Sequence, residues 1–400
     1  MYRLQGRSRI AAAIRLLGCL FLAVPVGMVC AQGVSQADVK QADQRGNESG
    51  RTASTRKASR RPVARPSKVQ RKSADKSPPV SPVRTPVPLL AGDLAKRTAA
   101  ELEALIAEQR NVIKTAARDE TARRNLGLVS VEAANRVLQA QSLGRAQEVS
   151  AYVALIRTSL ADTLWRVTQL AREEPVRAQA ALGLYYADGI LVPADLARGC
   201  DYFAKAAEAG QLAAAYRAAQ CFSKAEPERA QRWLEQSATG GNPAAQEAMG
   251  RACIEGTSID AACAKKWLQP AAAQGRVSAI SVLAWLYARE GTPKSLSQAA
   301  KLYRAAAEAG DFAAQNNLGE LLETGRGVPR EPAQALRWYR KSAGSGFAAA
   351  QFNLARLLAF GIGTERDTAA AREWATRAQG QGIAQAAELL QLIADAEKPH

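Results

Sequence analysis

A block of about 35 residues recurs along the second half of this 400-residue chain. Each copy ends in a glycine, and an aromatic residue or leucine lies eight residues before that glycine. The glycines are Gly210, Gly241, Gly275, Gly310, Gly346 and Gly382, and the residues that precede them are Tyr202, Trp233, Trp267, Leu302, Trp338 and Trp374. Such a period is typical of proteins built by stacking one supersecondary unit upon the next. The sequence therefore predicts a linear stack of about six units.

Each copy has the features of two helices joined by a turn. The first helix carries a small residue, such as Gly319, where the second helix must approach closely. We expect Trp338 to fill the resulting groove. The turn contains Gly325 and Gly327, and the closing Gly346 suits the left-handed conformation that ends a helix. One such pair cannot bury its own apolar face, whereas stacked pairs can.

The overall composition supports an all-α fold and argues against several catalytic classes. Hydrophobic residues make up 47% of the chain but aromatic residues only 6%, which favours helices over a β-sandwich. The single histidine, His400, is the last residue. A catalytic dyad with histidine, a Cys/His zinc site and haem held by histidine are thereby disfavoured. We expect no cofactor and no metal.

The blocks resemble the Sel-one-like repeat (SLR) family, a relative of the tetratricopeptide repeat. The best preserved copy is AAQNNLGELLETGRGVPREPAQALRWYRKSAGSG, residues 313–346, and the resemblance covers residues 177–383. It implies a right-handed α-solenoid of about six helix-turn-helix repeats that binds other proteins. Exported bacterial members look like adaptors of the cell envelope, and a cysteine-rich branch is associated with β-lactam binding. The turns at 222–227 and 290–293 depart from the family pattern.

Helical patterns flank the repeats on both sides. Residues 91–176 are predicted to form a helical segment, and residues 384–400 a capping helix and tail. Asp93 is the expected N-cap of the first of these helices. The predicted helices before the repeats are 94–118, 130–141 and 145–172.

The first 31 residues are predicted to be a secretory signal. Four arginines without an acidic residue precede an apolar run at 16–28, and Val29-Cys30-Ala31 resembles a cleavage site. A membrane anchor requires a longer apolar run than this one. A lipoprotein signal ending at Cys19 is an alternative. We therefore expect export, to the periplasm in the first instance, with lipid anchoring or secretion as alternatives and no transmembrane helix in the mature chain.

Residues 32–90 are predicted to be a disordered basic linker rich in Ser and Pro. They contain 13 Lys or Arg and 4 Asp or Glu, and no aromatic residue. Such a segment buries too little apolar surface to fold. It is either a solvated linker or a polycation that touches an anionic envelope surface. Specific nucleic-acid binding is disfavoured because no aromatic side chain is present to stack on bases.

The resemblance implies that the first helix of each repeat lines the concave face of the solenoid. On each first helix we take one outward-facing position per helical turn, counted from Leu318 and from the equivalent residue of the other repeats. These positions form a stripe that could bind a partner protein or peptide. Ser281 and Glu323 lie on the same count. The stripe consists of Tyr216, Gln220, Glu247, Arg251, Trp285, Asn316, Glu320, Phe352 and Arg356. The alternative is that its aromatic members pack between repeats and its charges are merely solvated.

Four cysteines remain after the predicted cleavage, and an even number in an exported chain suggests disulfides. Cys200 begins one predicted helix and Cys221 ends its antiparallel neighbour, whereas Cys253 and Cys263 flank one turn. We predict the pairs Cys200–Cys221 and Cys253–Cys263, with buried free thiols as the alternative. Neither pair has the spacing of metal ligands.

Candidate catalytic patterns are weak. Two S-x-x-K matches, Ser54–Lys57 and Ser73–Lys76, lie in the predicted linker, where no fixed base is expected. Gly361-Ile-Gly363 belongs to a repeat turn, not to a phosphate-binding loop. The sequence thus predicts a non-catalytic adaptor or scaffold of the bacterial envelope. The alternatives are a cell-wall enzyme or enzyme modulator of the β-lactam-binding type and, more weakly, a secreted protein that binds a host component or a polyanion.

Overall fold

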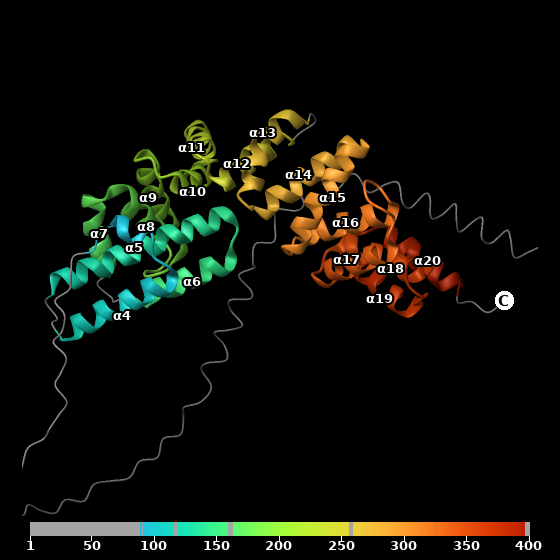
Figure 1. Ribbon diagram of the computed structural model, residues 1–400, viewed down its shortest axis with the longest axis horizontal. Helices are drawn as coiled ribbons and strands as arrows, with labels where there is room; N and C mark the ends of the chain where they lie inside the picture. The colour runs from blue at the N-terminus through green and yellow to red at the C-terminus, as the bar shows by residue number, and fades with distance from the viewer. Residues whose placement is uncertain (1–88, 90, 116–118, 159–162, 256–258, 397–400) are drawn as a thin grey trace, which may run out of the picture. The chain divides into compact units, whose positions relative to one another are not determined.

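The computed structural model describes residues 89, 91–115, 119–158, 163–255 and 259–396 (Figure 1). They belong to one compact unit, Thr85–His400. Every regular element in these residues is a helix. The predicted signal and all of the predicted basic linker except Leu89 lie outside the described residues.

Twelve consecutive helices form six antiparallel pairs in the order predicted from the repeats. Within each pair the two helices pack on one another, and the second helix also packs on the first helix of the next pair. The pairs, units 1 to 6, are α8 (Pro175–Asp188) with α9 (Leu196–Glu208), α10 (Leu212–Phe222) with α11 (Pro227–Thr239), α12 (Pro243–Ala252) with α13 (Ala261–Ala273), α14 (Val277–Glu290) with α15 (Pro293–Glu308), α16 (Phe312–Thr324) with α17 (Pro332–Gly344), and α18 (Ala348–Phe360) with α19 (Thr368–Gly380). The predicted all-α solenoid of six repeats is confirmed.

Polar caps and glycines set the bounds of these helices. The Asp311 carboxylate accepts a hydrogen bond from the Ala314 amide at 2.6 Å, and Asn242 caps α12 in the same way. Gly310 and Gly346, which follow α15 and α17, have φ of 95° and 87°. The left-handed ends predicted for the second helices are therefore present.

A small residue on the first helix receives a bulky residue of the second, as predicted, but the bulky residue is not the expected one. A Cβ atom on Gly319 would lie 2.8 Å from the ring of Tyr339, which is fully buried. Trp338 is only half-buried, with the Lys341 ammonium 4.3 Å from its ring centre. One residue turns a helix by about 100°, so the residue after the recurring tryptophan faces the groove. The prediction for Trp338 is wrong.

A recurring glutamine links units 3, 5 and 6 to the units before them. Gln246, Gln315 and Gln351 occupy the third position of the repeated Ala-Ala-Gln. Their amide groups donate to carbonyl oxygens near the ends of α11, α15 and α17 at 3.2, 3.1 and 3.4 Å. Each of these carbonyls also accepts a hydrogen bond from the backbone amide of the glycine that closes the preceding unit. The glutamine therefore adds a second hydrogen bond to a carbonyl oxygen that can accept two, and it ties its unit to the one before.

The turn of one unit rests on the start of the second helix of the preceding unit. Gly363, in the turn of unit 6, has φ of 73°, and a Cβ atom there would lie 2.5 Å from the Pro332 carbonyl carbon. Gly327 meets the backbone of Leu296 in the same way. Both positions therefore require glycine for conformation and for space.

Replacing Gly363 by alanine should destabilise the last two units by about 2 kcal/mol, through backbone strain and collision with α17. Gly344→Ala is the matched control, because no atom lies within 4 Å of a Cβ there and Gly344 is helical. That control should be neutral or slightly stabilising. Thermal unfolding of both variants by circular dichroism checks the prediction. Equal melting temperatures for the two variants would contradict it.

In the described residues five helices precede the repeats and one follows them. They are α3 (Ala91–Leu94), α4 (Ala99–Thr115), α5 (Glu120–Leu143), α6 (Ala146–Arg157), α7 (Thr163–Glu173) and, after the repeats, α20 (Gln385–Ala396). The helix predicted to start after Asp93 starts at Ala99, because Thr98 and Glu101 form a reciprocal cap. The helix predicted over 145–172 is divided into α6 and α7.

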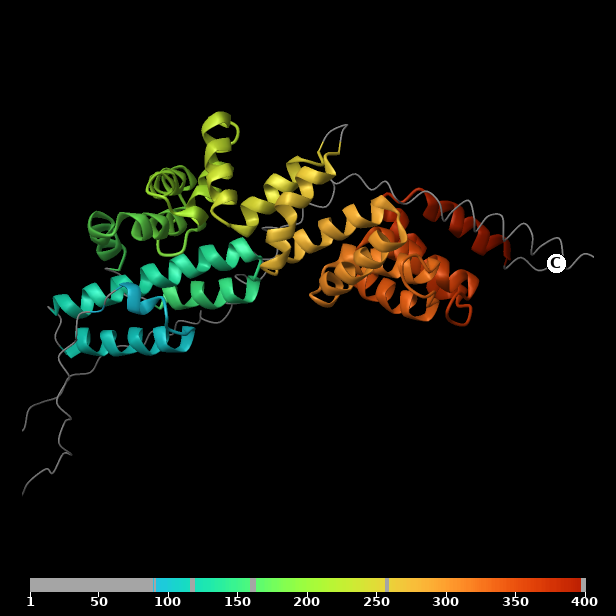
Figure 2. The same cartoon turned by 45° about the horizontal axis from the view of Figure 1, so that its top comes forward.

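Helix α5 packs across the first three units. It contacts α8, α10 and α12, which are the first helices of those units, and it also supports α4, α6 and α7 (Figures 1 and 2). Leu126, Val129, Ala133 and Val137 along α5 are buried. The sequence pattern placed α5 before the repeats but did not predict that it covers them.

Candidate functional site

The candidate site is the side of the first helices that carries the predicted stripe, here called the inner face. In units 1 to 3 this face is occupied by α5. The Tyr185 hydroxyl on α8 donates to the Ser130 carbonyl at 2.9 Å, and Gln211 donates to Asn135 Oδ1 at 3.1 Å. Arg276, which precedes α14, donates to the Ser142 carbonyl at 2.8 Å and so binds the carboxyl end of α5.

The covered part of the inner face differs in composition from the rest. The stripe positions of unit 1 are Ala180 and Leu184, and both are fully buried. In units 2 to 6 the same positions are mainly polar or aromatic. Apolar residues stand here at positions that the repeat pattern predicts to face solvent. They are the sequence signal that another helix of the same chain covers this part of the inner face.

In units 2 and 3 the predicted stripe residues belong largely to the boundary with α5. Tyr216 is half-buried and accepts a hydrogen bond from the exposed Gln220 at 3.1 Å. Glu247 is buried, and it forms ion pairs with Arg251 and Arg276. The sequence-based expectation that Glu247 faces outward is wrong. Whether Tyr216, Gln220 or Arg251 binds a partner stays a prediction.

In units 4 and 5 the stripe is partly open, whereas both stripe residues of unit 6 are buried. Trp285 and Glu320 are half-buried, and the Arg289 guanidinium lies 5.6 Å from the Trp285 ring centre. Three of the predicted outward residues are instead buried: Asn316, Phe352 and Arg356 are 6%, 1% and 8% exposed. Contacts between α16 and α18 account for two of them, because Asn316 pairs with Asn353 and Arg356 pairs with Glu323.

Polar contacts connect α16 and α18 across the inner face. Asn353 donates to Asn316 Oδ1 at 3.0 Å. Arg356 donates to Glu323 Oε2 at 2.6 Å, and the Tyr339 hydroxyl donates to the same oxygen at 3.1 Å. The Glu323 carboxylate is thus bound on two sides.

The carboxylates of Glu247 and Glu320 have opposite electrostatic environments. Burial alone would raise the pKa of Glu247, but Arg276, Arg251 and the Ser278 hydroxyl outweigh it and hold that pKa below its usual value. Burial raises the pKa of Glu320, and Arg326, 3.8 Å away, offsets this only in part. Glu320 is therefore a carboxylate with an incomplete set of partners.

These environments predict pH effects of opposite sign. A lowered pKa stabilises the fold above the unfolded value of about 4.3, and this stabilisation is lost as the pH falls through the folded pKa. A raised pKa penalises the fold while the carboxylate is charged, and protonation removes the penalty. Urea unfolding at pH 7 should show Glu247→Gln destabilised by about 2 kcal/mol and Glu320→Gln unchanged or slightly stabilised. The difference in free energy of unfolding between each variant and the wild type should become smaller near pH 4. Equal destabilisation of the two variants at pH 7 would contradict the opposite pKa shifts of Glu247 and Glu320.

Both predicted cysteine pairs are within disulfide distance, which confirms the pairing. The Cα atoms of Cys200 and Cys221 are 5.9 Å apart, and those of Cys253 and Cys263 are 5.8 Å apart. Cys200–Cys221 joins the start of α9 to the end of α10, between units 1 and 2. Unit 2 lacks the glycine turn that makes the corresponding contact in units 5 and 6, so the covalent link takes its place.

Loss of either disulfide should destabilise the first three units. The pairs close loops with separations of 21 and 10 residues, for which the chain-entropy model gives about 3 kcal/mol each. We expect Cys200→Ser/Cys221→Ser to unfold at lower guanidinium concentration than the wild type. Adding a reductant should shift the wild type toward the double variant and leave that variant less affected. An unchanged midpoint in both tests would contradict a stabilising role.

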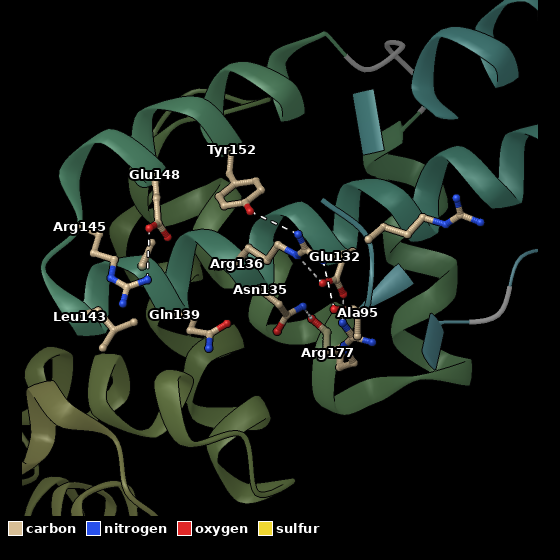
Figure 3. Close-up of a pocket in the computed structure, with 12 residues that line it drawn as sticks. Ala95, Glu132, Asn135, Arg136, Gln139, Leu143, Arg145, Glu148, Tyr152 and Arg177 are labelled. Carbon is tan, nitrogen blue, oxygen red and sulfur yellow. Dashed lines mark hydrogen bonds and ion pairs between the residues drawn. The ribbon is translucent and has the colours of Figure 1, made fainter. Parts of the chain in front are cut away.

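A polar pocket of about 400 Å³ lies between α5, α6 and α8 (Figure 3). On its wall the buried Glu132 carboxylate is shared by Arg136, at 2.7 Å, and Arg177. The Arg136 guanidinium also donates to the Tyr152 hydroxyl at 3.2 Å and to the Leu94 carbonyl at 3.1 Å. This cluster joins α3, α5, α6 and α8. Its charged groups form ion pairs with one another.

The remaining sequence candidates are the two S-x-x-K matches and the glycine turn of unit 6. The two S-x-x-K matches lie outside the described residues. Gly361 and Gly363 form the turn of unit 6, as predicted. In the described part of the chain no cluster of three His, Cys, Asp or Glu side chains could hold a metal ion. Among the same residues no helix has the length and apolar character needed to cross a membrane.

Comparison with known proteins agrees with this architecture. A family model described as Sel1 repeat matches residues 176–211, 212–242, 243–275, 277–311, 312–347 and 348–383, slightly more than half of the chain. The crystal structure of c5321, a protective antigen of uropathogenic Escherichia coli strains displaying an SLR fold, is 23% identical, with a TM-score of 0.56 over 75% of this chain and 74% of the antigen. A Sel1 repeat protein from Oxalobacter formigenes is 24% identical, with a TM-score of 0.48 over 61% of this chain and 96% of that protein. No curated protein matches the chain.

Proposed function

Because this chain belongs to the Sel1 repeat family, whose members are generally protein-interaction scaffolds, we propose that it is a non-catalytic adaptor. Its partner is a protein that binds the inner face of units 4 and 5. The observation that carries this proposal is the unequal coverage of that face. Helix α5 occupies units 1 to 3, whereas no helix in the described residues packs across α14 and α16 in the same way.

The side chains of this open stretch support an interaction role. Trp285, Asn317, Glu320 and Asn353 are half-buried on neighbouring first helices. Aromatic and polar groups held on rigid helices lose little entropy when a partner binds. The residues are presented by consecutive helices, so one partner can contact several units at once.

We further propose that the protein works in the bacterial cell envelope. The amino-terminal sequence has the pattern of a secretory signal, and both cysteine pairs are at disulfide distance, which fits an oxidising compartment. A basic linker between the signal and the folded unit would let the adaptor reach an anionic envelope surface.

Site-specific photo-crosslinking of the full chain tests the adaptor proposal. A benzophenone amino acid is placed at the exposed Arg289 or Thr324, one turn beyond Trp285 and Glu320. Matched controls carry it at the exposed Arg304 or Arg340 on second helices. We expect a discrete crosslinked protein from the inner-face positions only, identified by mass spectrometry. Crosslinks from the control positions alone would overturn the proposed surface.

The bait must retain α5. A fragment beginning at the repeats would expose Ala180, Leu184 and the rest of the covered face, and such a fragment would bind apolar segments non-specifically. Full-length chain cleaved after the signal is therefore the appropriate reagent for capture experiments.

A further inference from the structure

Exposed basic side chains recur at the same positions on the second helices of units 4 and 5. Lys301 and Arg304 on α15 lie nine and six residues before the closing glycine of unit 4, and Arg337 and Arg340 hold the same places on α17 in unit 5. All four residues are exposed. Residues three apart share one face of a helix, so each helix presents two cations on one side. We call these four residues the outer basic patch.

The two helices that carry the patch are neighbours in the stack. Both α15 and α17 pack on α16, and Gly327 in the turn of unit 5 meets the backbone of Leu296 near the start of α15 (Figure 1). Within the described residues none of the four patch side chains forms an ion pair, whereas the second helix of unit 6 holds the pair Arg377–Glu373. The charges of the patch are therefore free to attract an external anion.

The patch is not a general feature of the repeats. Helix α17 contains three basic residues and no acidic one, and α15 contains three basic residues and one acidic one. By contrast, α9 and α11 each contain two of either sign. At the patch positions unit 1 has Asp201 and Ala204, and unit 2 has Arg232 and Glu235. An excess of one sign on adjoining helices attracts the opposite charge, whereas a mixture does not.

We propose that the outer basic patch binds a membrane surface rich in anionic phospholipids. Charge complementarity requires an anion, and the predicted secretory signal would bring the patch to the envelope, where such lipids are present. A lipid surface is an array of charges that can contact both helices at once. This inference goes beyond the adaptor function, which uses the inner face. Because the ligand is not a protein, Arg304 and Arg340 stay suitable control positions for protein crosslinking.

The surroundings of the patch favour a lipid surface over single-stranded nucleic acid. Binding of single strands relies on exposed aromatic rings that stack on bases. Tyr303 and Tyr339, which lie between the cations in sequence, are buried. Trp338 is half-buried, and the Lys341 ammonium lies 4.3 Å from its ring centre. The patch therefore offers a ligand charge rather than stacking.

Vesicle co-sedimentation tests the inference on the full mature chain. The probe is a vesicle of phosphatidylglycerol and phosphatidylcholine in equal amounts, and vesicles of phosphatidylcholine alone are the neutral control. In the patch variant all four residues are replaced: Lys301→Gln/Arg304→Gln/Arg337→Gln/Arg340→Gln. It should bind the anionic vesicles at least about 10-fold more weakly than the wild type. Added salt should weaken the binding of the wild type, and neutral vesicles should bind neither protein.

A matched control variant removes the same number of charges elsewhere. Lys96, Lys114, Arg157 and Arg172 precede the repeats, are exposed and form no ion pair within the described residues. Their replacement by glutamine should leave vesicle binding within about 2-fold of the wild type, because screening confines such charges to short range. The basic linker is present in every variant and contributes equally to all. Wild-type binding by the patch variant, or an equal loss in the control variant, would overturn the inference.

A labelled short DNA duplex tests the competing class of ligand by fluorescence anisotropy. We expect the patch variant to lose less affinity for DNA than for anionic vesicles, because a rod contacts fewer of the four cations than a surface does. An equal or larger loss for DNA would make the patch a general polyanion site and overturn the lipid assignment. Protein crosslinks from Arg289 or Thr324 would still support the adaptor function in that case, so the two proposals fail separately.

Discussion

Replacing Tyr339 by alanine should destabilise the protein by about 3–5 kcal/mol, whereas replacing the neighbouring Trp338 should cost about 1 kcal/mol. Tyr339 is fully buried against Gly319, so its removal leaves a cavity between α16 and α17 and also removes the hydrogen bond to Glu323. Trp338 is half-buried and remains in contact with solvent. The larger residue of the pair should therefore matter less.

Guanidinium unfolding followed by circular dichroism measures both effects. Tyr339→Phe keeps the ring and removes only the hydroxyl, so it should cost about 1 kcal/mol. Because repeat proteins unfold in parts, the loss should appear first in the transition that includes units 5 and 6. A larger loss for Trp338→Ala than for Tyr339→Ala would contradict the packing described above.

The difference between these two residues shows what a repeat pattern can and cannot predict. Recurrence at a fixed spacing correctly located the helices, their glycine ends and the small residue of the first helix, such as Gly319. The repeat pattern does not show which of the recurring residues packs into the groove between the two helices. Trp338 and Tyr339 are adjacent in sequence, and the groove selects the one whose direction from the helix axis is correct.

The candidate site was predictable only in its general position. The helical period places Trp285, Glu320 and Phe352 on one side of their helices, but it does not predict which of them the folded chain buries, and Phe352 is buried. The occupation of units 1 to 3 depends on contacts between segments far apart in sequence, such as Asn135 with Gln211. The cysteine pairs were predictable because each pair lies at the ends of adjoining helices.

Removing the Glu132 carboxylate should destabilise the attachment of α5 to unit 1 by about 3–5 kcal/mol. Glu132 is 4% exposed and is the shared partner of Arg136 and Arg177, so Glu132→Ala leaves two guanidinium groups facing each other with no anion between them. Their repulsion and lost hydrogen bonds add to the cavity that the side chain leaves. Glu132→Gln should recover part of the loss, since its amide oxygen can still accept one hydrogen bond.

Glu148→Ala is the matched control, because Glu148 lines the same pocket but pairs with Arg145 where both side chains are half exposed to solvent. Such a pair contributes about 0–1 kcal/mol. Hydrogen exchange followed by mass spectrometry should show faster exchange in α5 for Glu132→Ala and unchanged exchange for Glu148→Ala. The same exchange rates across α5 in both variants would mean that apolar contacts alone hold this helix on the inner face. In that case the polar cluster would be dispensable, and the Leu126–Val137 stretch of α5 would be the place to weaken the attachment.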